Sequence, residues 1–346
     1  IHRAAALLTV GAMLSDTACA ATATPDLTTT GFGIAALALF VMAYALVIAE
    51  EFTELRKSKP VVFAAGALWV LVALAWQRHR IDGAGVALRH NLLEHRELLL
   101  FLLAAMTFVN TLEERHVFAA LRSWLLARRL SLRSVFWLTG LMAFFLSPVL
   151  DNLTTALVMG AVVVAMGRGQ AAFVAPACIN VVVAANAGGA FSPFGDITTL
   201  MVWQKGILGF FEFFALFLPA LTNWLVPALC MSFAIAAGRP IPDRESVSTK
   251  PGAYVVVGIF ALTIVMTVSM HQFVHLPPFL GMMTGLGVLQ LYGFLIRRRE
   301  LRGNHGAFPQ PVPPGLKPAH RPFDIFISLK RVEWDTLLFF YGVIPG

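Results

Sequence analysis

Two short motifs in this sequence place an aspartate and hydroxyl groups inside apolar stretches. Residues 151–155 read DNLTT, and residues 196–199 read DITT. Carboxylate, amide and hydroxyl oxygens are the ligands that hard cations prefer. Each aspartate also stands where it could cap a helix. Capping alone needs no charge, and an ionised carboxylate is expensive inside a bilayer, so a functional role is favoured if these stretches lie in a membrane.

The composition indicates a membrane protein. Hydrophobic residues make up 58% of the chain, charged residues 13%, and the mean hydropathy is +0.75. Soluble domains carry about 25% charged residues, so a water-facing surface is excluded for most of this chain. The basic residues fall in short clusters between apolar runs, which is typical of cytoplasmic loops and argues against a nucleic-acid partner. The three cysteines have neither a disulfide pattern nor zinc-ligand spacing.

Apolar runs predict several membrane spans, since about 20 residues cross a bilayer. We expect these spans near residues 31–49, 60–76, 97–111, 211–236, 253–270 and 277–296. Two further apolar regions, residues 134–166 and 171–204, are interrupted by polar residues, proline or glycine. These two regions contain the aspartate motifs.

The first irregular region predicts a hairpin. As one straight helix, residues 134–166 would be about 50 Å long, whereas the hydrocarbon core is about 30 Å thick. The pair Ser147-Pro148 and the motif at Asp151 interrupt the run, and arginines flank both of its ends. A re-entrant hairpin with two arms of about 15 residues and a polar tip at Asp151 explains these features.

The second irregular region predicts a discontinuous helix. Residues 186–196 contain three glycines and a proline, which are poor helix formers. Apolar arms flank this stretch on both sides, which places it near the middle of the bilayer. Non-helical backbone is tolerated there only where it is buried in protein or lines a cavity, as in transporter binding sites. Asn180 and Asn186 add amide oxygens just before the break.

The two motifs together suggest ion exchange. A carboxyl group at membrane depth can hold either a proton or a sodium ion, because desolvation favours its neutral form and a bound cation favours its charged form. Alternating exposure of such a group exchanges one ion for the other. The predicted cation- and proton-binding residues, with the two aspartates as the sodium ligands, are Asp151, Asn152, Thr154, Thr155, Asn186, Ser192, Asp196, Thr198 and Thr199.

A weak internal similarity suggests an inverted repeat. Residues 96–102 (RELLLFL) resemble residues 334–340 (WDTLLFF), and the expected topology gives the two segments opposite orientations. We therefore expect a signal peptide at 1–20, a transmembrane region with the first repeat at 21–298, and a cytoplasmic Pro-rich linker at 299–331. Residues 332–346 would begin a second repeat that is largely missing from this chain.

The two long motifs resemble those of the NhaD-type sodium/proton antiporters, a group within the ion transporter superfamily. The resemblance rests on residues 147–155 (SPVLDNLTT), 186–199 (NAGGAFSPFGDITT) and 333–342 (EWDTLLFFYG). It implies a bacterial inner-membrane antiporter that exchanges sodium or lithium for protons. It further implies an all-α polytopic fold of two inverted repeats, with a re-entrant hairpin and a discontinuous helix in each.

Other functions stay open at this point. Sodium-coupled uptake of a dicarboxylate or oxyanion is the main alternative, although anion sites favour neutral hairpin tips and helix N-termini over aspartates. An intramembrane aspartyl protease is disfavoured, because Pro193 and Leu150 stand where its two motifs require glycine and tyrosine. An inactive membrane fragment is the third alternative. We expect a transporter rather than an enzyme, with no cofactor, with the lipid bilayer as its surroundings and with a homodimer as one open assembly.

Overall fold

The structure is a computed structural model that describes residues 27–81, 83–128, 130–235, 238, 248–303 and 325–343. Within these ranges the chain folds into helices joined by short turns, and no strand occurs. The predicted signal peptide at 1–20 lies outside the described residues. The chain divides into two compact units, one within Ile1–Asn91 and Leu338–Gly346 and the other within Leu92–Leu337. Each unit is considered by itself.

Unit 1 is built from α2 (Gly31–Ile48), α3 (Glu50–Thr53) and α4 (Ser58–Arg78). Thr30 caps α2 by accepting a hydrogen bond from the backbone N–H of Gly33. α2 packs along α4, yet most of its apolar side chains are exposed. Exposed apolar side chains of this kind are expected of a helix that faces lipid.

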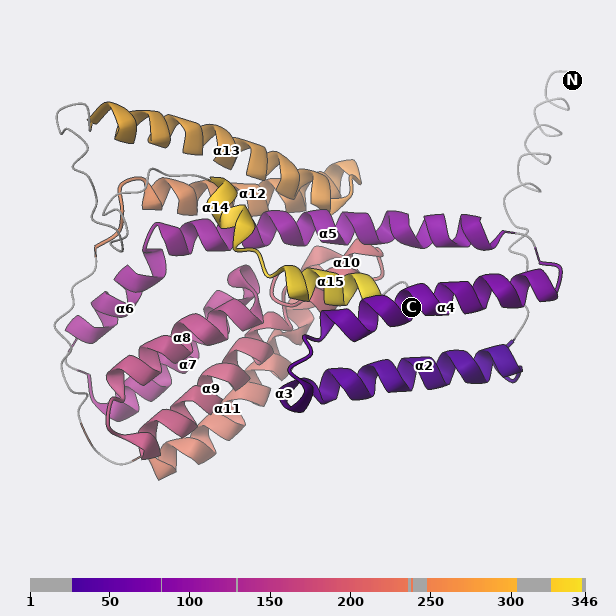
Figure 1. The fold of residues 1–346 in the computed structure, drawn as a ribbon. Helices are drawn as coiled ribbons and strands as arrows, with labels where there is room; N and C mark the ends of the chain where they lie inside the picture. The colour runs from indigo at the N-terminus through magenta and orange to yellow at the C-terminus, as the bar shows by residue number, and fades with distance from the viewer. Residues whose placement is uncertain are drawn as a thin grey trace, which may run out of the picture. The chain divides into compact units, whose positions relative to one another are not determined.

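Unit 2 contains the helices around both aspartate motifs (Figure 1). Its described elements are α5 (Ala84–Glu114) from Leu92 onward, α6 (Val117–Ala127), α7 (Leu132–Leu150), α8 (Asn152–Met166), α9 (Ala171–Gly189), α10 (Ile197–Gln204), the 3₁₀ helix η1 (Phe210–Leu216), α11 (Phe217–Ala234), α12 (Ala253–Val274), α13 (Pro278–Gly303), α14 (Ile325–Lys330) and the first turn of α15 (Trp334–Val343).

The first irregular region forms a helical hairpin, as expected. α7 and α8 pack against each other and return to the same end of unit 2, with Asp151 between them (Figure 1). The pair Ser147-Pro148 interrupts the apolar run but lies inside the helix α7. α7 is therefore 19 residues long, whereas α8 has the 15 residues expected of an arm.

The second irregular region is a discontinuous helix whose break is shorter than expected. α9 continues through Asn186 and ends at Gly189, and α10 begins at Ile197. Gly188 and Gly189 are helical, and their lack of a side chain lets α9 approach neighbouring backbone closely. The non-helical segment is thus residues 190–196 rather than 186–196.

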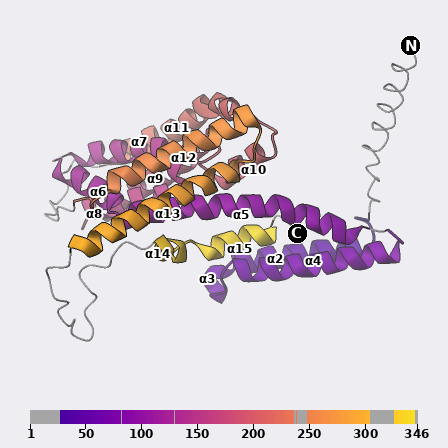
Figure 2. The same ribbon diagram turned by 90° about the horizontal axis from the view of Figure 1, so that it is seen from above.

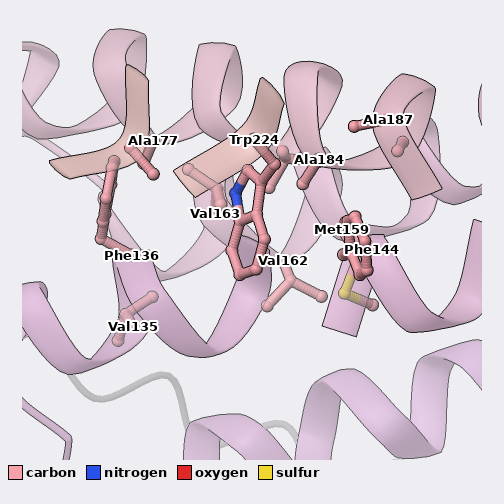
Figure 3. Packing of buried hydrophobic residues seen from close by; sticks show 14 of the residues in the cluster. Val135, Phe136, Phe144, Met159, Val162, Val163, Ala177, Ala184, Ala187 and Trp224 are labelled. Atoms are coloured by element: carbon pink, nitrogen blue, oxygen red, sulfur yellow. The ribbon is translucent and has the colours of Figure 1, made fainter. Parts of the chain in front are cut away.

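The core of unit 2 lies where α7, α8, α9 and α11 meet. The indole of Trp224 stacks on Phe144 with ring centroids 5.2 Å apart, and Figure 3 shows it among aliphatic side chains of this cluster. The indole N–H of Trp224 donates to Asn180 Oδ1 at 2.9 Å, and Asn180 Nδ2 donates to the Phe136 carbonyl at 2.8 Å. Asn180 is therefore a hydrogen-bonded core residue, which satisfies its polar group in an apolar interior.

The remaining spans agree with the sequence prediction. α12 and α13 lie side by side in both views (Figure 1, Figure 2). Among the described residues, seven helical segments are long and apolar enough to cross a membrane: α2, α4, α7, α9, η1 with α11, α12 and α13. The expected span at 97–111 lies within the longer helix α5. The chain is an all-helical, multi-pass membrane protein.

The described part of the predicted linker at 299–331 is helical except for Arg331, which lies in a turn. α13 continues to Gly303, and α14 covers Ile325–Lys330. Residues 304–324, which hold the proline-rich part, lie outside the described residues. α15 begins at Trp334, within the segment predicted to open a second repeat.

Candidate functional site

Asp151 forms the tip of the α7–α8 hairpin. Its side chain caps α8, because Oδ1 accepts a hydrogen bond from the Thr154 backbone N–H at 2.8 Å and Oδ2 accepts one from the Thr154 hydroxyl at 2.8 Å. Its backbone has φ 70° and ψ 158°, a conformation that L-residues seldom adopt. The hairpin tip is therefore held by hydrogen bonds to the carboxylate, although its backbone conformation is unfavourable for an L-residue.

Asp196 stands at the end of the second break. It caps α10, but its Oδ1 accepts only a long hydrogen bond of 3.4 Å from the Thr198 backbone N–H. The Thr199 hydroxyl is within 2.8 Å of the backbone carbonyls of both Ser192 and Asp196. The Thr199 hydroxyl thus stabilises the non-helical segment through its carbonyl groups. The Asp196 carboxylate is held less tightly than that of Asp151.

Hydrogen bonds join the two breaks directly. The Asn152 backbone N–H donates to the Gly195 carbonyl at 3.0 Å, and Asn152 Nδ2 donates to Asn186 Oδ1 at 3.1 Å. The Ser192 hydroxyl donates to the Pro148 carbonyl at 2.9 Å. Three of the predicted residues, Asn152, Asn186 and Ser192, therefore hold the two regions together.

Ser147 is a structural residue of this junction that the predicted set omitted. Its side chain is fully buried, and its hydroxyl donates to the Ala185 carbonyl in α9 at 2.6 Å. The sequence signal was the Ser-Pro pair in the first motif, but its partner lies 38 residues away in the chain. Local spacing cannot reveal such a partner.

Glycines allow the two helices to meet backbone to backbone. Pro148 has no N–H to donate to the Phe144 carbonyl one turn earlier. Gly188 of α9 lies so close to that carbonyl that a Cβ there would clash with its oxygen. Gly189 and Gly195 face each other in the same way, since a Cβ on Gly189 would lie 2.7 Å from the Gly195 carbonyl oxygen.

A cavity of about 60 Å³ opens between the two breaks and the facing helices of unit 2. Asp151, Asn152 and Asp196 contribute to its wall. The rest of the lining is apolar: Phe101, Leu102, Ala105, Met106, Val109, Val149, Leu150, Pro193, Phe194, Ile197, Leu200, Phe260 and Met282. Two carboxylates that are far apart in the sequence therefore share one small, mostly apolar space.

The other predicted residues surround this cavity without lining it. Thr154 holds Asp151, whereas the side chain of Thr198 is exposed and only its backbone contacts Asp196. The Thr155 hydroxyl is buried and has no hydrogen-bond partner in the described part of the chain. A buried hydroxyl of this kind usually binds a water molecule or an ion.

Comparisons with known proteins decide the family. The sequence profile described as citrate transporter matches residues 1–346. The chain belongs to the citrate transporter family. Among individual proteins, this family member is similar to the Na(+)/H(+) antiporter NhaD of Vibrio cholerae, with 49% identity over 92% of this chain and 68% of the relative.

Two further relatives extend the comparison. The Na(+)/H(+) antiporter NhaD of Alkalimonas amylolytica is 48% identical over 94% of this chain and 69% of its own length. Sodium/proton antiporter 1 of Arabidopsis thaliana is 29% identical over 90% of this chain and 51% of its own length. This member of the citrate transporter family is accordingly a transporter and not an enzyme.

Proposed function

We propose that this protein exchanges sodium or lithium ions for protons across a bacterial inner membrane. The observation that carries the proposal is the pair of carboxylates, Asp151 and Asp196, at two crossing helix breaks in one apolar cavity. Relatives that are 48–49% identical and named Na(+)/H(+) antiporters support the same transport reaction. The NhaD-type resemblance in the two motifs agrees with them.

The two aspartates are held differently. Thr154 orients the Asp151 carboxylate with two hydrogen bonds. The Asp196 carboxylate accepts one long hydrogen bond of 3.4 Å from the Thr198 backbone N–H, so its oxygens keep lone pairs for a cation. We therefore assign cation binding to both carboxylates together.

The size and chemistry of the cavity suit a small cation. A cavity volume of about 60 Å³ exceeds the roughly 10–15 Å³ that a cavity needs to hold one water molecule. A sodium ion that keeps one or two waters would fit beside the carboxylates, with the Asn152 side-chain amide as a further source of an oxygen ligand. Protonation of the carboxylates removes the negative charge that attracts the ion, so sodium and protons compete.

Alternating access requires this site to open to each side in turn. The discontinuous helix and the hairpin meet at the site, as in transporters whose binding sites lie between inverted repeats. The inverted repeat itself, with residues 334–340 opening the second copy, stays a prediction. Sites of this kind use half-helices because their ends orient backbone groups toward an ion.

Citrate or dicarboxylate uptake is the second candidate, because the matching family profile is described as citrate transporter. One feature argues against it: the ionisable groups that line the cavity are carboxylates, which repel an anionic substrate. Labelled citrate uptake with and without sodium, measured on the same preparation, separates this candidate from ion exchange.

The test of the proposal is dye-monitored proton movement in everted membrane vesicles that contain the full-length protein. Addition of sodium or lithium should dissipate the proton gradient. Asp151→Asn and Asp196→Asn should each lower the rate about tenfold or more, because a hydrogen bond or contact to a charged group is worth about 1.5–3 kcal/mol. Glu51→Gln, at an exposed carboxylate in α3, is the matched control and should leave the rate unchanged. Undiminished exchange in both aspartate variants would refute the assignment.

A further inference from the structure

We propose that α6 and the base of the α7–α8 hairpin bind the headgroup of an anionic phospholipid from the surrounding bilayer. α6 (Val117–Ala127) has 11 residues and is therefore about 16 Å long, which is too short to cross a hydrocarbon core of about 30 Å. It joins the end of α5 to the start of α7 at one end of unit 2 (Figure 1). A short helix at this place lies along the membrane interface.

The faces of α6 fit that placement. Phe118 and Leu125 are buried, and Leu125 belongs to the hydrophobic core of unit 2. Trp124 is 48% exposed, and Arg128 at the end of the helix is exposed as well. The helix is thus anchored to the protein on one face and presents an aromatic and a basic side chain on another, the pair of residue types found at bilayer surfaces.

Trp124 and Arg128 form a preorganised pair. The guanidinium carbon of Arg128 lies 4.4 Å from the centre of the Trp124 ring, in cation–π geometry. This contact fixes the guanidinium at the level where Trp side chains lie in membranes, which is the level of the headgroups. A planar guanidinium binds phosphate oxygens with two parallel hydrogen bonds.

The segment from Arg115 to Arg168 is rich in basic residues. It contains six arginines, counting both ends, and one acidic residue, Asp151 at the hairpin tip. Arg133 is exposed at the start of α7, where its Nε donates to the Ile235 carbonyl at 3.1 Å. Basic residues near a bilayer surface attract anionic lipid.

The base of the hairpin adds to the same surface. α7 starts and α8 ends at this end of unit 2, so Arg133 and Arg168 flank the hairpin there (Figure 1). α6 packs against α8. A lipid phosphate bound by Arg128 and Arg133 would therefore contact the interfacial helix and the hairpin that carries Asp151 at its tip.

Lipid retention on the purified full-length protein tests this inference without reference to transport. Native mass spectrometry should detect bound phosphatidylglycerol or cardiolipin and much less phosphatidylcholine when the three are offered equally. Arg128→Gln with Arg133→Gln should reduce the retained anionic lipid several-fold. Arg298→Gln with Arg299→Gln removes the same charge from exposed residues at the end of α13 and should have little effect.

A third variant separates a built site from simple charge attraction. Trp124→Leu keeps every charge but removes the ring that positions Arg128, so it should also reduce retention of anionic lipid. Equal losses in the α6 and α13 double variants, no loss in Trp124→Leu, or equal binding of phosphatidylcholine would each overturn the proposal. Thermal unfolding of each variant shows whether a loss merely reflects misfolding.

Discussion

At the scale of residues, Thr154 controls how the Asp151 carboxylate is presented. Both carboxylate oxygens accept a hydrogen bond from this one residue, from its backbone N–H and from its hydroxyl. Only the hydroxyl bond can be removed by mutation. Thr154 lies next to the proposed cation site but does not form part of the cavity wall.

Thr154→Val should raise the sodium concentration needed for half-maximal exchange several-fold, because one Asp151 oxygen loses its donor while the shape of the side chain is kept. Thr154→Ser retains the hydroxyl and is the matched control, with near-normal sodium dependence. Sodium titrations of exchange in everted vesicles at fixed pH measure both. Identical titrations for valine and serine would show that the hydroxyl does not tune the site.

The sequence motifs predicted that the two aspartates and their neighbours form a site. They did not distinguish the residues that line the cavity from the residues that hold the helix breaks in place. Asp151, Asn152 and Asp196 line the cavity, whereas Asn186, Ser192 and Thr199 bridge or close the breaks. This division depends on which side chain meets which carbonyl across two helices. The apolar wall contributed by α5, α12 and α13 was equally hidden, because its members have no chemical signature in the sequence.

At the scale of elements, the site depends on the crossing of α7 and α9. Periodicity and breaker residues predicted a hairpin and a discontinuous helix, and both are present. They began the second break too early, at Asn186 instead of after Gly189. Close backbone contact explains this error, since Gly188 and Gly189 are used for proximity inside a helix and not to end it.

Gly188→Ala tests this crossing. A Cβ at this position would clash with backbone in α7, which cannot move without shifting Asp151, so we expect a loss of about 1–3 kcal/mol in stability and reduced exchange. Gly160→Ala in α8 is the control, because a Cβ there meets nothing within 4 Å. Thermal unfolding in detergent should show a lower midpoint for Gly188→Ala only. Equal midpoints would mean that the contact is looser than described.

At the scale of the whole molecule, the charge distribution along unit 2 indicates its orientation. The end of α5, α6, the start of α7 and the end of α13 gather at one end in both views (Figure 1, Figure 2). Clusters of basic residues lie in these segments, and such clusters remain in the cytoplasm. The turn between α12 and α13, at His275, lies at the other end of unit 2.

We therefore expect a cysteine at position 275 to face the periplasm and one at 298 to face the cytoplasm. His275→Cys and Arg298→Cys, each introduced after replacement of Cys19, Cys178 and Cys230 by serine, can be tested with a membrane-impermeant maleimide on intact cells. Only the His275→Cys protein should react before the cells are opened. The reverse pattern would invert the topology and assign α6 to the outer surface.

The backbone of Asp151 imposes a conflict between folding and ion binding. With φ 70° and ψ 158°, the position suits glycine, and any other residue there carries about 1–3 kcal/mol of strain. A hairpin optimised for thermostability alone would have glycine at its tip and would lack the carboxylate. Selection for heat resistance alone should therefore favour variants with glycine in place of Asp151, which no longer bind the ion. A screen for exchange activity has to accompany such a selection.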